Sequence, residues 1–252
     1  MNSKPLRPKT PANGSRLVRS LAALGVSDTE VSHKHFALRL GQLIDLSDSI
    51  RISGAHASRL EATFEPGADS FEELKEEFLQ VRHAMVTSII ESFGSNTGVS
   101  RVRFPRPTLQ APVDSSSGYL PYGNFYTAHQ RDMDFKIGQL STRVREAAAS
   151  ASADLAQLAT LDGVLADTLA VHSRKAFARM AGLLGKRFDQ LLSDYRQAEE
   201  APQRSTGTWP ELLEIFSREM RELLLAEVEA RLLPTQGLIE ALNSEIDNKS
   251  YE

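Results

Sequence analysis

The densest group of side chains able to do acid–base chemistry lies at residues 126–134, in the stretch YTAHQRDMD. A histidine can exchange a proton near neutral pH, and a nearby aspartate can orient its imidazole. His129 with Asp132 or Asp134 would therefore supply the general base of a hydrolase. Such a mechanism also needs a nucleophile or a set of metal ligands, and neither converges on this stretch in the sequence. A catalytic and a structural interpretation both have to be weighed.

Apolar periodicity around this stretch favours the structural interpretation. The residues of the apolar stripe recur at steps of three and four, as on one face of a helix: Tyr122, Tyr126, His129, Met133, Ile137, Leu140, Val144 and Ala148. We therefore predict that His129 lies in a core or interface, hydrogen-bonded through one ring nitrogen. Gln130 and Asp134 are four residues apart and can hydrogen-bond to each other.

The same face is also a candidate surface for a partner protein. In that case the residues expected to contact the partner are Tyr122, Tyr126, His129, Gln130, Arg131, Asp132 and Met133. The periodicity does not say whether this stripe faces its own chain or another copy, so a homo-oligomer remains open as well.

Composition excludes several classes of protein. The 252 residues include no cysteine, which excludes a disulfide framework, a thiol nucleophile and a Cys-ligated zinc site. No run of about 18 uncharged apolar residues is present, so we expect no membrane insertion. The first residues lack the apolar core of a secretory signal, and we expect a soluble cytoplasmic protein. The motifs HExxH, GxSxG and GxGxxG are missing, so we predict no enzyme, metal or cofactor.

Positive charge is concentrated in a few segments although the net charge is −4. Residues 1–60 contain nine Lys and Arg against four Asp and Glu, whereas residues 211–252 contain four against ten. The two ends could attract each other, or the basic segments could bind a polyanion. The residues that would then contact nucleic acid are Lys4, Arg7, Lys9, Arg16, Arg19, Arg101, Arg103, Arg106, Lys175, Arg179 and Lys186.

The first part of the chain contains three predicted helices. The first lies around residues 17–24 and ends at Gly25, and the second covers about residues 29–51. The third starts with a capping box at Ser70 and ends near residues 93–94. Residues 94–118 contain three prolines, and we expect them to form a loop. We expect this loop to pack on its own domain; the alternative is that its basic part lies on a partner in extended form.

Longer helices are predicted after this loop. The first of them begins near Ser117–Tyr119. The four helices after it cover residues 155–169, 177–195, 209–232 and 237–245. Pro121 is expected in the first turn of the first one, Thr208 is expected to cap the helix at 209, and Pro234 is expected to interrupt that helix. No segment shows the alternation of a strand. The sequence predicts an all-α helical bundle of about seven or eight helices, with long antiparallel helices in the C-terminal part.

These elements divide the chain into five segments. They are a disordered basic tail (1–13), an N-terminal helical part (14–93), a Pro-rich loop (94–118), a C-terminal long-helix bundle (119–245) and a tail (246–252).

Several stretches together resemble a bacterial family known only as a domain of unknown function. They are GSRLVRSLAALGV (14–26), FALRLGQLIDLSDSI (36–50), YTAHQRDMD (126–134), IGQLSTRVR (137–145) and LLPTQGLIEALNSE (232–245). Members of that family are typically encoded beside MotA/TolQ-like proton-channel proteins and OmpA-like peptidoglycan-binding proteins. The resemblance implies a protein partner from the same locus and a role as the accessory protein of a type III Zorya anti-phage system. It implies no catalytic residues.

Three functions follow from these observations. The first is a non-enzymatic helical adaptor in a proton-channel-coupled anti-phage system, and the second is a DNA-binding effector subunit of the same system. The third is a hydrolase that uses His129, which full defence activity of a stably folded His129→Ala protein would exclude. A helical scaffold unrelated to defence is a further alternative to the first.

Overall fold

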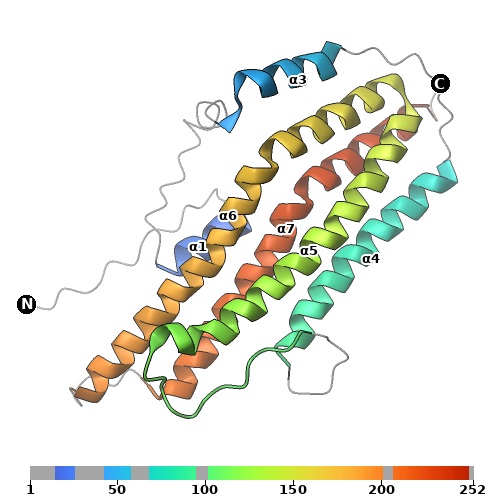
Figure 1. Ribbon diagram of the computed structural model, residues 1–252. Helices are drawn as coiled ribbons and strands as arrows, with labels where there is room; N and C mark the ends of the chain where they lie inside the picture. Colours follow the sequence, from blue (N-terminus) through green and yellow to red (C-terminus); the bar gives the residue numbers. More distant parts are fainter. Residues whose placement is uncertain (1–14, 26–42, 58–67, 95–101, 201–206, 250–252) are drawn as a thin grey trace, which may run out of the picture. The chain divides into compact units, whose positions relative to one another are not determined.

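The computed structural model describes residues 15–25, 43–57, 68–94, 102–200 and 207–249. This part of the chain is all-α, as predicted, and forms six helices (Figure 1). The helices are α1 (Arg16–Ala23), α3 (Leu46–Ala57), α4 (Ala68–Ser92), α5 (Ser115–Ala151), α6 (Ala153–Glu200) and α7 (Trp209–Lys249). The predicted basic tail at residues 1–13 lies outside the described residues.

The chain divides into two compact units, each built from three separate stretches. Unit 1 comprises Met1–Val31, Val86–Asp132 and Phe177–Ala230, and unit 2 comprises Ser32–Met85, Met133–Ala176 and Arg231–Glu252. Helices α5, α6 and α7 each contribute one part to each unit. Each unit is therefore assembled from distant parts of the sequence.

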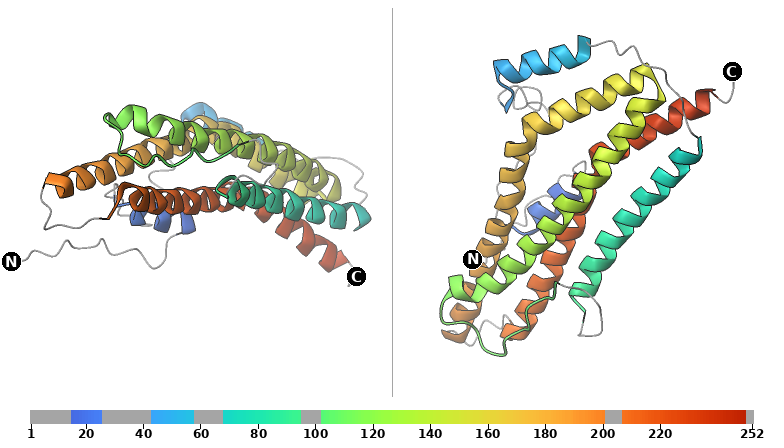
Figure 2. Two further views of the ribbon diagram at one scale, coloured as in Figure 1. Left: turned by 90° about the horizontal axis from the view of Figure 1, so that it is seen from below. Right: turned by 45° about the vertical axis from the view of Figure 1, so that its right-hand side comes forward.

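Unit 1 has an aromatic core at the start of α5 and α7. The Phe188 ring on α6 lies 5.7 Å from Tyr122, 5.4 Å from Phe216 and 5.6 Å from Trp209 between ring centroids. All four side chains are buried. Burial of this apolar surface, together with edge-to-face ring contacts, stabilises the meeting point of the three helices. Within this unit α1 and α5 lie on opposite sides of α7 (left view of Figure 2).

Unit 2 has an apolar core around the hairpin between α5 and α6. Ser152 separates these antiparallel helices (Figure 1), and its side chain accepts a hydrogen bond from the Leu155 N–H at 3.3 Å. The core side chains come from α4, α5, α6 and α7 and include Phe71, Leu74, Phe78, Met85, Leu140, Val144, Leu155, Leu232, Leu238 and Leu242. The break between the two helices therefore lies within the Ala/Ser run at residues 147–153.

Several helix ends are those expected from capping chemistry. Helix α1 ends just before Gly25, whose φ of 66° lies in the left-handed region that glycine adopts without strain. Helix α7 begins at Trp209, and the preceding Thr208 donates its N–H to the Glu211 carboxylate at 2.8 Å, which is half of a capping box. Helix α4 ends at Ser92, as predicted.

Other predicted helix starts were wrong by a few residues. Helix α5 begins at Ser115 because Asp114 caps it, accepting from the Ser116 hydroxyl at 2.8 Å and the Ser117 N–H at 3.0 Å. These hydrogen bonds lower the pKa of Asp114 to about 2, with the Ser116 hydroxyl as the largest cause. Pro121 is consequently the seventh residue of α5 and lies beyond the first turn.

Two further boundaries also differ from the prediction. The prediction of one continuous helix over residues 29–51 is wrong at its C-terminal end. There, Asp45 and Asp48 accept hydrogen bonds from each other's backbone N–H and form a cap that starts α3 at Leu46. Most of that predicted helix lies outside the described residues. Helix α4 begins at Ala68, so Ser70 lies inside the helix rather than at its cap.

The predicted total of seven or eight helices was too high for the described part of the chain, because two predicted breaks do not occur. Residues 155–169 and 177–195 belong to one helix, α6. Residues 171–176 between them are all exposed, so the apolar stripe is interrupted by loss of burial while the backbone stays helical. Helix α7 likewise continues through Pro234, and Leu232 and Leu238 on either side are buried. Their packing offsets the hydrogen bond that the proline cannot donate.

Gly118 allows the chain before α5 to pack closely against the helix. A Cβ at this position would lie 2.5 Å from Pro112 Cγ and 3.3 Å from Phe188 Cε1. We expect Gly118→Ala to lower the free energy of unfolding by about 1–3 kcal/mol, because the Pro112 ring would have to move. The matched variant Gly182→Ala, in open space on α6, should instead raise it by about 0.5–1 kcal/mol. Urea denaturation of both variants checks this, and equal effects would contradict it.

Candidate partner-binding cleft

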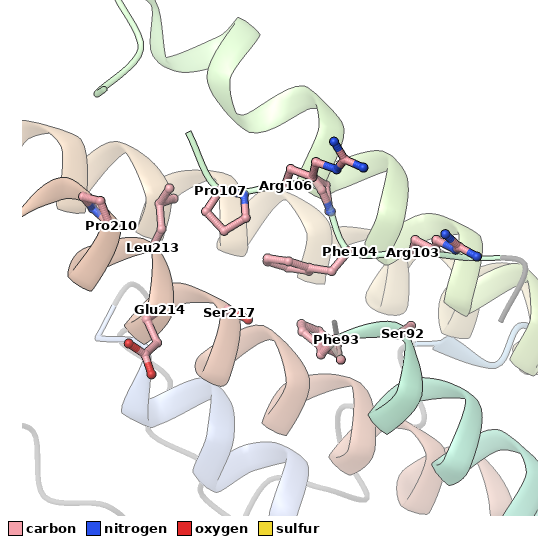
Figure 3. Close-up of a pocket in the computed structure, with 12 residues that line it drawn as sticks. Ser92, Phe93, Arg103, Phe104, Arg106, Pro107, Pro210, Leu213, Glu214 and Ser217 are labelled. Carbon is pink, nitrogen blue, oxygen red and sulfur yellow. The ribbon is translucent and has the colours of Figure 1, made fainter. Parts of the chain in front are cut away.

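Unit 1 contains a cleft of about 760 Å³ beside the start of α7. One wall is the irregular segment Arg103–Pro107, and the opposite wall is the first two turns of α7, from Pro210 to Ser217. The end of α4, at residues 92–94, closes one side. Figure 3 shows the Phe104 ring turned toward the space in front of Leu213 and Ser217. The walls are mainly aromatic, proline and leucine side chains, as in most binding sites for organic groups.

An aromatic cluster holds the segment Arg103–Pro107 in place. The Phe104 ring stacks on Phe93 at 4.8 Å and meets Phe125 edge-on at 5.3 Å. It also lies 5.3 Å from Tyr122. The Phe104 N–H donates to the Ser92 carbonyl at 2.9 Å, which ties the segment to the end of α4. The loop predicted to pack on its own domain therefore does so over this segment.

Ser92 and His129 form the hydrogen bond that joins α4 to α5 behind the cleft. The Ser92 Oγ lies 3.0 Å from His129 Nε2 and 2.7 Å from the Ile89 carbonyl oxygen. Because a carbonyl can only accept, the single hydroxyl proton of Ser92 goes to Ile89, and His129 Nε2 must be the donor. In this arrangement His129 cannot take the Ser92 proton, so the pair does not have the geometry of a Ser–His nucleophile. The prediction of a buried, hydrogen-bonded histidine agrees with this geometry.

Charged groups line the outer edge of the cleft with opposite signs on its two walls. Arg103 and Arg106 are exposed on the irregular segment, and Glu214 is exposed on α7. The Arg106 guanidinium points away from α7 (Figure 3). An occupant that touches both walls would meet apolar surface in the middle, cations on one side and a carboxylate on the other.

Two polar residues of YTAHQRDMD, Tyr126 and Gln130, are engaged inside unit 1 around Glu227. Glu227 on α7 is fully buried and accepts from the Tyr126 hydroxyl at 2.6 Å. The Gln130 side-chain amide donates to both Glu227 oxygens, at 2.9 and 3.1 Å, and to the Phe177 carbonyl at 2.9 Å. The expected pairing of Gln130 with Asp134 was wrong, since Asp134 bonds to Arg231 in unit 2. The observed partners, Glu227 of Gln130 and Arg231 of Asp134, lie on α7, so residue spacing along α5 could not reveal these hydrogen bonds.

The candidate partner-contact residues on α5 differ in exposure. Tyr122, Tyr126, His129, Gln130 and Met133 are buried within the chain itself. Asp132 is half-buried, and Arg131 is exposed. The stripe Tyr122–Ala148 is buried as predicted at all positions except Ile137, which is half-buried.

The candidate nucleic-acid contacts fall into three groups. Lys4, Arg7, Lys9 and Arg101 lie outside the described residues. Arg16 is engaged by Glu222 at 2.9 Å and by Glu229 at 2.7 Å, so its charge is used inside unit 1. The side chains that remain exposed are Arg19, Arg103, Arg106, Lys175, Arg179 and Lys186.

Sequence reasoning missed Ser92 and Glu227 as the partners of the motif. Ser92 belongs to the last turn of α4, and Glu227 is one of ten acidic residues in the C-terminal stretch. Its position between Leu224 and Val228 on the buried face of α7 is the only local signal that it is not a solvated charge.

Further features of the described residues bear on function. None of the described helices is long and apolar enough to cross a membrane. In the same part of the chain, no group of three or more His, Asp or Glu side chains is placed to hold a metal ion.

A family model described as protein of unknown function (DUF3348) matches residues 1–244. The chain belongs to this family. The matched region of the DUF3348 family includes the cleft, the Glu227 cluster and the YTAHQRDMD motif. Comparison with curated proteins and with solved structures gives no match.

Proposed function

We propose that this DUF3348 protein is a non-enzymatic helical adaptor that binds a partner protein in the cleft of unit 1. The observation that carries the proposal is the cleft itself, whose wall is a proline-containing segment fixed by Phe93, Phe104 and Phe125. A preformed apolar site loses little conformational freedom on binding, which favours affinity. The hydrogen-bond direction between His129 and Ser92 speaks against the hydrolase alternative.

The charges at the edge of the cleft define the partner segment that would fit. An apolar side chain would lie between Phe104 and Leu213, with an acidic group toward Arg103 and Arg106 and a basic group toward Glu214. Complementary charges of this kind set orientation and association rate. From the resemblance of the chain, we propose that the partner is encoded in the same locus and belongs to a proton-channel-coupled anti-phage system of the type III Zorya kind.

A pull-down from cells that carry the neighbouring genes tests the adaptor role. We expect a partner protein to be recovered after nuclease treatment, and Ser217→Tyr, which fills the cleft, to reduce its recovery about tenfold or more. The matched variant Ser193→Tyr, on an exposed part of α6, should leave recovery unchanged. The charge reversal Arg103→Glu/Arg106→Glu should also weaken binding, whereas Arg82→Glu, exposed on α4, should not.

Two outcomes would overturn the adaptor proposal. One is equal recovery of the partner with Ser217→Tyr and Ser193→Tyr. The other is recovery of nucleic acid with a partner that is lost on nuclease treatment. The second result would favour the DNA-binding alternative, which is supported by the exposed side chains of Lys175, Arg179 and Lys186. Binding through such phosphate contacts must weaken steeply as salt is raised.

A further inference from the structure

A second pocket, of about 510 Å³, lies between α1 and α7 in unit 1, and the proposed function does not use it. Helix α1 contributes Arg16, Arg19, Ser20, Ala23 and Leu24 to its lining. Helix α7 contributes Arg218, Glu219 and Glu222. This lining differs from that of the cleft at every residue, so the two sites can be tested separately.

Both carboxylates in this pocket are already paired with arginines. Arg16 donates to Glu222 and to Glu229, two turns further along α7, and thereby fastens α1 to α7. Arg187 on α6 forms a two-point contact with Glu219, with both distances at 2.8 Å. Side-by-side arginine–carboxylate pairs of this kind are among the stronger ion pairs. The negative charges of Glu219 and Glu222 are therefore already balanced by arginines in the absence of a ligand.

Two guanidinium groups in the lining remain available. Among the residues that the structure describes, neither Arg19 nor Arg218 has an ion-pair partner, and both side chains are exposed. Each guanidinium offers a planar fork of N–H donors that can bind two oxygens of a phosphate group. The Ser20 hydroxyl adds a further donor.

We propose that the α1–α7 pocket binds a phosphate ester, with Arg19 and Arg218 holding the phosphate group. Its volume lies in the range of sites for small organic molecules, and Ala23 and Leu24 supply apolar surface for the ester's organic part. The same chemistry is presented by a free nucleotide and by the backbone of a nucleic-acid strand. The two sources differ in their response to salt, since a strand releases many counterions on binding.

Isothermal titration of the full chain at low salt tests this site. The probes are inorganic phosphate, adenosine 5′-monophosphate and a short oligothymidylate. We expect binding of at least one probe, and a loss of affinity of about tenfold or more in Arg19→Gln/Arg218→Gln. Arg19→Lys/Arg218→Lys keeps the charge and loses the two-point geometry, so its affinity should fall between the two. Tighter binding of the mononucleotide identifies a free ester, and tighter, salt-sensitive binding of the oligothymidylate identifies a strand.

The matched control is Arg82→Gln/Arg131→Gln, which removes the same charge from exposed positions outside the pocket. It should bind the probes like the unaltered protein. The proposal is overturned if no probe binds the unaltered protein. It is also overturned if the Arg19/Arg218 glutamine variant binds as well as the unaltered protein, or if the control loses as much affinity. Thermal unfolding of each variant shows whether it is folded, and the lysine variant provides the comparison should the glutamine variant unfold.

Discussion

Replacing Glu227 with alanine is expected to lower the free energy of unfolding by about 3–5 kcal/mol. Glu227 accepts hydrogen bonds from Tyr126 and Gln130 in the interior of unit 1. Without its carboxylate, the Tyr126 hydroxyl loses its acceptor at 2.6 Å and keeps the weaker contact to Met180 Sδ at 3.7 Å, while the Gln130 amide keeps the Phe177 carbonyl. Losing a strong acceptor costs each buried donor about 1–3 kcal/mol, and the truncated side chain leaves a cavity as well.

Graded variants separate the hydrogen bonds from the volume. Glu227→Gln keeps the size and one accepting oxygen, so its loss should be clearly smaller than that of Glu227→Ala. Glu214→Ala removes an exposed carboxylate from the same helix and should change the free energy of unfolding by less than about 0.5 kcal/mol. Equal losses for Glu227→Ala and Glu214→Ala in urea denaturation would show that the buried cluster does not stabilise the fold.

Phe188→Ala is expected to destabilise the protein by a similar amount, about 3–5 kcal/mol. The Phe188 ring is almost completely buried and contacts the rings of Tyr122, Phe216 and Trp209. Its removal leaves a void where α5, α6 and α7 meet. Helix α7 forms one wall of the cleft, and Tyr122 on α5 packs against Phe104 in the other wall. We therefore expect partner binding to weaken together with stability.

The matched control for Phe188→Ala makes the same chemical change at an exposed site. Phe135 on α5 is 64% exposed, so Phe135→Ala removes little buried surface and should cost less than about 1 kcal/mol. A loss for Phe188→Ala no greater than that for Phe135→Ala would contradict the assignment of Phe188 to the core.

The sequence predicted best those features that depend on neighbouring residues. Spacing of three and four placed Tyr126, His129 and Met133 on the buried face of α5, and capping chemistry placed the start of α7 after Thr208. The sequence-based prediction was wrong at residues 171–176 and at Pro234, where it placed helix breaks that do not occur. At residues 171–176 the backbone stays helical although the apolar stripe stops, and at Pro234 the buried Leu232 and Leu238 keep the helix packed although a hydrogen bond is lost.

The candidate sites could be predicted only in part, because their residues meet across large distances along the chain. Arg103 and Arg106 stood out as basic residues near prolines, but their position opposite Glu214 depends on the packing of α7. Arg19 and Arg218 lie far apart in the sequence and face one pocket only because Arg16 fastens α1 to α7. No local pattern encodes such a pairing.

Trp209 is an intrinsic fluorescence probe of unit 1. It is the only tryptophan in the chain, it is buried at the first residue of α7, and Pro210 beside it lines the cleft. Its emission should be blue-shifted in the folded protein and should move to longer wavelength when this end of unit 1 opens. Circular dichroism reports all the helices at once, so comparing the two signals during unfolding tells whether the cleft is lost before the rest. The same indole gives a label-free signal for titrating a partner into the cleft.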